Sequence, residues 1–118
     1  MDTPIRVTRY FLRHWKYYID NRNELSYPER KSARALFNGL KAMQESEVLL
    51  LHEKYCTGFK TLKSYAYKPI TDKVIADRRG MSELTYRKQR ASIEAKLHEL
   101  VVKELERIED EKETFHFI

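Results

Sequence analysis

The chain has 118 residues, of which 35% are charged, and its 23 lysines and arginines against 18 acidic residues give a net charge of +5. This length fits one domain with a small core, and the low glycine and proline content argues against disorder. The single cysteine, Cys56, excludes an internal disulfide, and no apolar run is longer than Val48 to Leu51, so we expect no membrane span and a cytoplasmic location.

The N-terminal part of the chain has the residue spacing of helices. A first helix is predicted over residues 4–20, with its apolar and aromatic residues broadly on one side: Ile5, Tyr10, Phe11, His14, Trp15, Tyr18 and Ile19. After a polar break, a second helix is predicted to begin at Pro28 and to run to about Met43. A third is predicted from Glu47 to Tyr55, with Ser46 as its cap.

The stretch from Cys56 to Pro69 is the least regular part of the sequence. It combines aromatic residues with Lys60, Lys63 and Lys68. We predict a basic, aromatic loop here. Such a loop can lie along a phosphate backbone, but it can equally well pack over a small core.

The segment from Thr71 to Leu97 has the pattern of two helices joined by a tight turn at Gly80 and Met81. Ala76 supplies the small residue that two steeply crossing helices need where they touch, and Gly80 can adopt the positive φ of a sharp corner. Ser82 is a good N-cap for the second helix, because its hydroxyl can accept a hydrogen bond from a free backbone N–H. These features predict a helix-turn-helix.

The second helix of this motif has one side for the core and one for a ligand. Tyr86 is predicted to point into the protein, and Arg87 and Lys88 to point outward, towards a groove. Arg79 and Gln89 stand where such motifs usually pack aliphatic residues. We therefore expect other helices to cover this small core.

The last helix is predicted to be long, because no glycine or proline occurs from Ser82 to about Lys112 and apolar residues recur at steps of three and four. It would extend about 45 Å. Its far half needs a cover, either the N-terminal helix or a second chain in a homodimer. The acidic residues from Glu94 to Glu113 are expected on its exposed side.

The predicted fold class is therefore all-α. We expect an N-terminal helical region at 1–44 and a second region at 45–118 that holds the helix-turn-helix and the long C-terminal helix, in one compact domain overall. The charge is distributed unevenly over these regions. Residues 60–90 carry nine bases and three acids, for +6, whereas residues 91–118 carry four and eight, for −4. A basic surplus at the motif attracts phosphates and favours double-stranded DNA as a partner.

Short motifs spread over residues 45–105 resemble the promoter-reading C-terminal domain of sigma factors. They are Leu49 to Tyr55, Ile75-Ala76, Gly80-Met81-Ser82, Tyr86-Arg87 and Leu97. In size and layout the chain resembles phage late transcriptional regulators of the ArpU/RinA type, which are similar to region 4 of sigma factors. This resemblance implies a sequence-specific DNA-binding regulator of phage or prophage late genes, in the cytoplasm of a bacterial host, with RNA polymerase as a further candidate partner.

The resemblance also implies roles for residues around the turn. Those that would face the major groove are Ser82, Glu83, Leu84, Arg87 and Lys88. Of these, Arg87 or Lys88 would pair with guanine. Phosphate groups would be held by Lys73, Thr85, Arg90 and the lysines of the loop, which fix the register without reading sequence.

Nothing in the sequence favours an enzyme. His52 and Cys56 are four residues apart on a predicted helix and so share a face, as two ligands of a metal would, but no second pair has a fitting spacing, which favours packing or an inert surface instead. No glycine-rich phosphate loop or nucleophile elbow is visible. We therefore expect no catalytic residue, no metal and no cofactor.

Two other classes of function remain open. One is DNA packaging, because a small-terminase-like protein also joins a helix-turn-helix to oligomerising helices. The other is an adaptor whose helices bind a protein such as RNA polymerase without reading DNA. A ring-sized oligomer would favour the first, and the absence of salt-sensitive DNA binding would favour the second.

Overall fold

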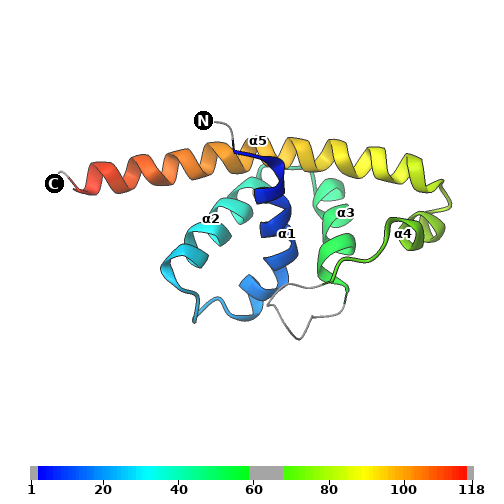
Figure 1. Cartoon of the computed structure of the whole chain (residues 1–118), viewed down its shortest axis with the longest axis horizontal. Coiled ribbons are helices and arrows are strands. Elements are labelled where there is room, and N and C mark those ends of the chain that lie inside the picture. The colour runs from blue at the N-terminus through cyan, green and yellow to red at the C-terminus, as the bar shows by residue number, and fades with distance from the viewer. Residues whose placement is uncertain (1–2, 59–67, 117–118) are drawn as a thin grey trace.

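The computed structural model describes the backbone of residues 3–58 and 68–116, and the side chains of residues 3–58 and 68–110. This part of the chain is all-α, as the sequence predicts (Figure 1). Its helices are α1 (Ile5–Asp20), α2 (Tyr27–Lys41), α3 (Glu45–Cys56), α4 (Asp72–Arg79) and α5 (Glu83–His116). None of these helices has the length and apolar content needed to cross a membrane. The predicted basic loop, with Lys60 and Lys63, lies mostly outside the described residues.

The long helix α5 is the spine of the molecule. It has 34 residues and runs along one edge, with α1, α2 and α3 lying against one side of it and α4 against its N-terminal end (Figure 1). The molecule measures 56 × 29 × 24 Å. Part of the cover predicted for the far half of α5 is supplied within the chain, but mainly by α2 rather than by the N-terminal helix expected from the sequence.

Helix starts are set by short-range hydrogen bonds. At α2 the backbone N–H of Ser26 donates to the Glu29 carboxylate at 2.9 Å, and the Glu29 N–H donates back to the Ser26 hydroxyl at 3.4 Å, in a capping box. The prediction that Ser46 caps the third helix is wrong. Gln44 is the N-cap instead: its N–H donates to the Glu47 carboxylate at 3.0 Å and its carbonyl accepts from the Glu47 N–H at 3.0 Å, so α3 begins two residues earlier than predicted.

One hydrophobic core joins the two regions expected from the sequence. It includes Trp15 of α1, Leu36 of α2, Leu51 of α3, and Leu97 and Val101 of α5. Regions 1–44 and 45–118 therefore share their buried surface. Where α2 crosses α5, Gly39 allows close contact, since a Cβ atom there would lie 3.0 Å from Leu97 Cδ1 and 3.3 Å from Val101 Cγ2.

Three predicted positions lie elsewhere than expected. Tyr10 and Ile19 of α1 are exposed. The buried side of this helix is formed instead by residues spaced three or four apart, namely Thr8, Phe11, Leu12, Trp15 and Tyr18. Glu94, expected on the exposed acidic side of the last helix, is completely buried. Its burial is explained by the ion pairs described below.

Candidate nucleic-acid interface

The corner between α4 and α5 is built by glycine in a left-handed conformation. Gly80 has φ 66° and ψ 34°, and it is the one residue with positive φ in the described part of the chain. Its N–H donates to the Asp77 carbonyl at 3.3 Å, and the Met81 N–H donates to the Ala76 carbonyl at 3.0 Å. This pair of bonds is a Schellman motif, which satisfies the last carbonyls of α4 and turns the chain sharply.

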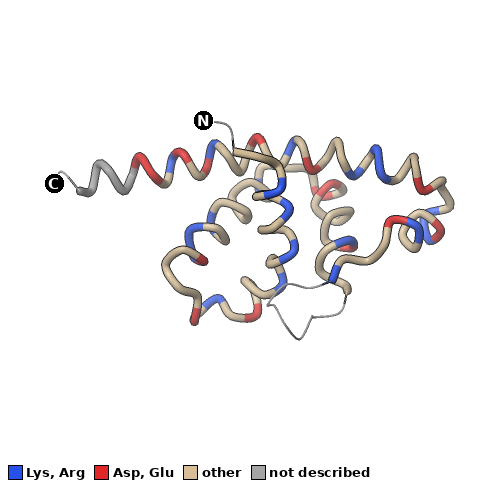
Figure 2. Tube along the Cα trace, in the orientation of Figure 1, with Lys and Arg blue, Asp and Glu red and all other residues tan. Residues whose placement is uncertain are grey.

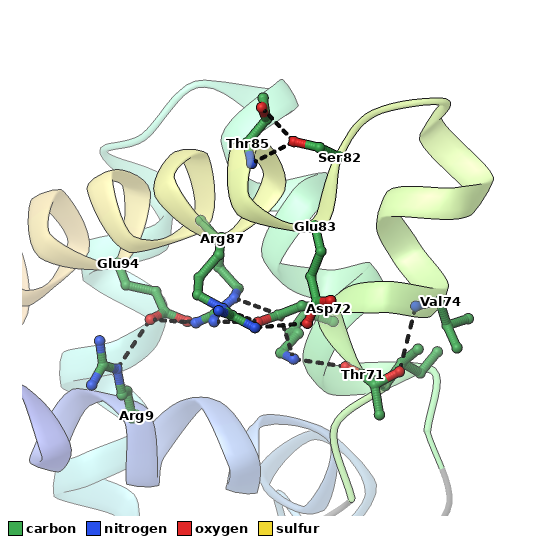
Figure 3. A network of polar contacts seen from close by, with 12 residues as sticks. Arg9, Thr71, Asp72, Val74, Ser82, Glu83, Thr85, Arg87 and Glu94 are labelled. Atoms are coloured by element: carbon green, nitrogen blue, oxygen red, sulfur yellow. Dashed lines mark hydrogen bonds and ion pairs between the residues drawn. The ribbon is translucent and has the colours of Figure 1, made fainter.

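Both helices of the motif begin with a hydroxyl cap. Thr71 Oγ1 accepts from the Val74 N–H at 3.4 Å at the start of α4. Ser82 Oγ accepts from the Thr85 N–H at 3.1 Å at the start of α5 (Figure 3). The Ser82 cap confirms the prediction from the sequence. Because both caps are local in sequence, they fix where the two helices start without help from the rest of the fold.

The inner side of the motif is a small buried cluster. Ile75 and Ala76 of α4 and Tyr86 of α5 are buried, and Met81 packs partly against them. Tyr86 therefore points inward, as predicted. Its hydroxyl has no hydrogen-bond partner among the described residues, and burial is the main cause that raises the Tyr86 pKa to about 12.

The outer side of α5 is open at its first turns. Leu84 is 58% exposed and the Arg87 side chain is 52% exposed. Five further residues expected to contact DNA are also exposed: Lys73, Ser82, Glu83, Thr85 and Lys88. The one exception near the turn is Arg90. These residues all belong to one end of the molecule, formed by α4, the turn and the adjoining end of α5 (Figure 1).

The exception is Arg90, which lies in an internal ion-pair network rather than on the surface. Its side chain is only 14% exposed. Arg90 donates from Nε and Nη2 to the Asp72 carboxylate, at 3.0 and 2.9 Å. It also donates from Nη1 to both oxygens of Glu94, at 3.0 and 3.1 Å. With all three nitrogens engaged in this way, Arg90 is not placed to hold a phosphate.

The same network reaches the neighbouring helices. Asp72 also accepts from Lys54 Nζ at 2.8 Å, and Lys54 donates in turn to the Ile70 carbonyl at 2.7 Å. Glu94 accepts from Arg9 Nε at 3.1 Å and from the Tyr55 hydroxyl (Figure 3). The network therefore ties α4 and α5 to α1 and α3, so that the helix-turn-helix is braced against the body of the protein.

The charge states in this network follow from its hydrogen bonds. Burial by itself would raise the pKa of Asp72, but the bonds donated by Arg90, Lys54 and Arg87 outweigh it and hold that pKa well below its usual range. Burial would lower the pKa of Arg90, but the carboxylates of Asp72 and Glu94 raise it instead. Both groups are therefore charged at neutral pH.

Sequence reasoning missed Asp72, Glu94 and Lys54 as members of the site. A signal for two network members was present, because Arg90 and Glu94 continue the buried row of α5 from Tyr86 to Leu97 in steps of four, four and three. A charged pair on such a row is buried only if the charges satisfy each other. The contacts with Arg9 and Tyr55 depend on tertiary packing and gave no signal.

The exposed surface at the motif is basic and lies away from the acids of α5. Among the exposed side chains of residues 72–90 are five bases and two acids, whereas those of residues 91–110 include three bases and four acids. In Figure 2, blue positions line α1, blue and red positions both occur around the motif, and red positions alternate with blue along the far part of α5. A phosphate-bearing partner is therefore attracted to the end that holds α4.

The His52–Cys56 pair does not form part of a larger cluster. No group of three or more potential metal ligands occurs within the residues that the structure describes. His52 packs edge-on against Trp15, with ring centroids 5.4 Å apart. Cys56 is buried, and this burial is the main cause that raises the pKa of its thiol to about 12, so it stays protonated at neutral pH.

Comparisons with known proteins add no relative: no family model, no curated protein and no solved structure matches this chain.

Proposed function

We propose that this chain is a sequence-specific DNA-binding protein that places the first turns of α5 in the major groove. The observation that carries the proposal is the two-sidedness of α5 at the Gly80 corner. Tyr86, Arg90 and Glu94 anchor its inner side, whereas Arg87 and Lys88 stand exposed on its outer side. A rigidly held helix with exposed cations in its first turns has the geometry of helix-turn-helix readers.

Arg87 is the best candidate for reading a base. Its Nε donates to Asp72 at 3.2 Å and its Nη2 donates to Glu83 at 2.7 Å. These bonds restrict the rotation of the side chain, while its Nη1 has no partner within the described residues. The outer edge of the guanidinium is therefore left for guanine O6 and N7, and the side chain loses less freedom on binding.

The remaining contacts divide by position. Lys88 lies next to Arg87 on the open side of α5, and Glu83 can accept a hydrogen bond from cytosine N4. Lys73 and Thr85 are exposed and are assigned to phosphates. Arg90 is left out of the interface because its donors are committed to Asp72 and Glu94.

The finer proposal is a transcriptional regulator of phage or prophage late genes, with RNA polymerase as a second partner. It is supported by the sigma-like motifs at Leu49–Tyr55 and Ile75–Arg87 and by the basic surface at α4. A footprint within a late-gene promoter, together with a changed transcript yield in a reconstituted polymerase reaction, tests this part separately from DNA binding.

The first prediction concerns discrimination by Arg87. Arg87→Lys keeps the positive charge but removes the planar fork that pairs with guanine. We expect the variant to lose about 1–3 kcal/mol of preference for its best site, with little change in binding to random duplex. Selection from a genomic fragment pool, followed by gel shifts of the selected and random duplexes, measures both quantities.

Lys73→Gln is the matched comparison, because it removes a charge assigned to phosphate. It should weaken binding to all sequences alike and reduce the slope of log K against log salt by about 1. If Arg87→Lys and Lys73→Gln both select and bind the same fragments as the wild-type chain, with the same affinity, the interface is assigned to the wrong residues.

DNA packaging is the second candidate, and one observation favours it. The last turns of α5 project beyond the other helices, where a second chain can pack against them (Figure 1). Light scattering separates the two functions. A ring-sized oligomer indicates a packaging protein, whereas a monomer or a homodimer joined through α5 agrees with a regulator.

A further inference from the structure

Helix α1 carries a row of cations outside the helix-turn-helix. Arg6, Arg9, Arg13 and Lys16 are spaced by three, four and three residues, so they share one side of the helix. Asp20 is the single acidic residue between Ile5 and Asp20, which leaves the helix at +3. The row is visible as blue positions along α1 in Figure 2.

Two members of this row have no counter-charge within the described residues. Arg9 pairs with Glu94 at 3.1 Å and Lys16 with Asp20 at 2.9 Å. Arg6 and Arg13 have no ion-pair or hydrogen-bond partner among the described residues. Two unpaired guanidinium groups about two turns apart on one helix form a positive surface that attracts anions.

Tyr10 lies between these arginines and is well suited to the same ligand. It is 50% exposed, and its ring stacks on His14 with centroids 4.0 Å apart, which fixes its orientation. Arg6, Val7, Tyr10 and Arg13 line an open hollow of about 330 Å³. Arginine and tyrosine are both common donors to phosphate oxygens of nucleic acid.

The helix that carries this row packs directly against α5, and an internal chain of ion pairs joins it to the helix-turn-helix. The ion pairs lead from Arg9 through Glu94, Arg90 and Asp72 to Arg87 (Figure 3). Residues 87 and 94 are separated by about 10 Å along α5, at ~1.5 Å per residue. This is close to the ~12 Å width of the major groove. A phosphate strand at the edge of a groove that holds Arg87 would then lie about as far along α5 as the point where α1 contacts it through Arg9 and Glu94.

We propose that α1 is a second duplex-binding surface, in which Arg6 and Arg13 pair with phosphates at the edge of the groove and Tyr10 donates a hydrogen bond between them. This inference rests on the proposed function, because it places the same duplex on both surfaces. In this arrangement, the phosphate contacts of α1 increase the affinity for the duplex and fix its orientation, and α5 contacts the bases.

The test is the salt dependence of binding by Arg6→Gln/Arg13→Gln. Each lost phosphate contact reduces the slope of log K against log salt by about 0.9, so we expect a reduction of about 1.8. The ratio of wild-type to variant affinity should then shrink by about tenfold between ~50 and ~200 mM salt. The preference for the best site over random duplex should stay unchanged.

Arg22→Gln/Lys41→Gln is the matched control, because it removes two exposed cations that lie outside α1. It should keep nearly the wild-type slope. Tyr10→Phe is a further variant, since it removes the hydroxyl but keeps the ring. It should lower affinity about equally at both salt concentrations. Thermal melting checks that each variant is folded.

Each outcome decides between the proposals. A reduced slope for the α1 variant, with the control at the wild-type slope, supports the surface on α1. If the two double variants lose affinity and slope equally, only net charge matters and the surface on α1 is overturned, while the reading by α5 stands. If the wild-type chain binds no duplex in a salt-sensitive way, the proposed function fails, and the α1 surface fails with it.

Discussion

At the scale of single residues, the function of this chain depends on which charges are held inside and which are left outside. Arg87 and Arg90 are three residues apart, yet one is half-exposed and the other is enclosed by Asp72 and Glu94. Buried charges persist only when they are paired and hydrogen-bonded, which is the situation of Arg90. Asp72 accepts hydrogen bonds from both arginines, so its substitution tests the network most directly.

We predict that Asp72→Asn destabilises the protein by about 3 kcal/mol at pH 7, because it leaves the largely buried Lys54 and Arg90 without a counter-charge. The folded-state pKa of Asp72 is depressed, so its stabilising contribution is present above its unfolded pKa of about 3.9 and is lost as the pH falls towards the folded value. The stability difference between wild type and variant should therefore be constant above about pH 5 and shrink below about pH 4.

Urea unfolding at a series of pH values between about 3 and 7 measures this difference. Asp77→Asn is the control, since Asp77 is exposed on the same helix and should give a small, nearly constant difference. A loss of stability in Asp72→Asn that is equally large at pH 3 and pH 7 would show that the carboxylate charge is not what stabilises the network.

At the scale of elements, the Gly80 corner decides how α4 presents α5. A Cβ atom at this position would meet nothing within 4 Å, so any effect of substitution is conformational rather than steric. The left-handed conformation costs most residues about 1–2 kcal/mol but is tolerated better by asparagine. The corner is therefore sensitive to the backbone preferences of one residue.

We predict that Gly80→Ala lowers the free energy of unfolding by about 1 kcal/mol, and that Gly80→Asn lowers it by less. Denaturant unfolding gives both values. If alanine is as stable as glycine here, the corner does not hold residue 80 at the positive φ described above.

At the scale of the whole molecule, α5 unites the two regions of the chain. Its N-terminal end carries the proposed interface, its middle packs against α1, and α2 covers it further along. At Gly39 the backbone of α2 lies very close to the side chains of α5. An added Cβ atom there would be 3.0 Å from Leu97, whereas one at Gly80 would meet nothing within 4 Å. The body of the protein and the helix-turn-helix are thus joined through one continuous helix.

We predict that Gly39→Val destabilises the protein by about 1–3 kcal/mol, because the new methyl groups overlap the buried side chains of Leu97 and Val101. Ala42→Val is the control, as Ala42 is exposed at the end of α2. Differential scanning calorimetry of the two variants compares them. Equal melting temperatures would mean that α2 and α5 have room to separate.

The sequence by itself determined the helical class, the long last helix, the corner at Gly80 and the cap at Ser82. These features arise from residues within about four positions of one another, whose preferences act in any surrounding. For the same reason, the inward Tyr86 and the outward Arg87 could be assigned from helical spacing.

Only the tertiary structure decided the burial of Glu94, the withdrawal of Arg90 from the surface and the lack of a partner for Arg6 and Arg13 within the described residues. Arg9 and Glu94 are 85 residues apart in the sequence, and nothing local to either residue specifies the other. From the sequence alone, a charged side chain is predicted to be exposed to solvent. Whether it is instead buried against an opposite charge depends on how distant helices pack, and this packing decides whether the residue can contact a ligand.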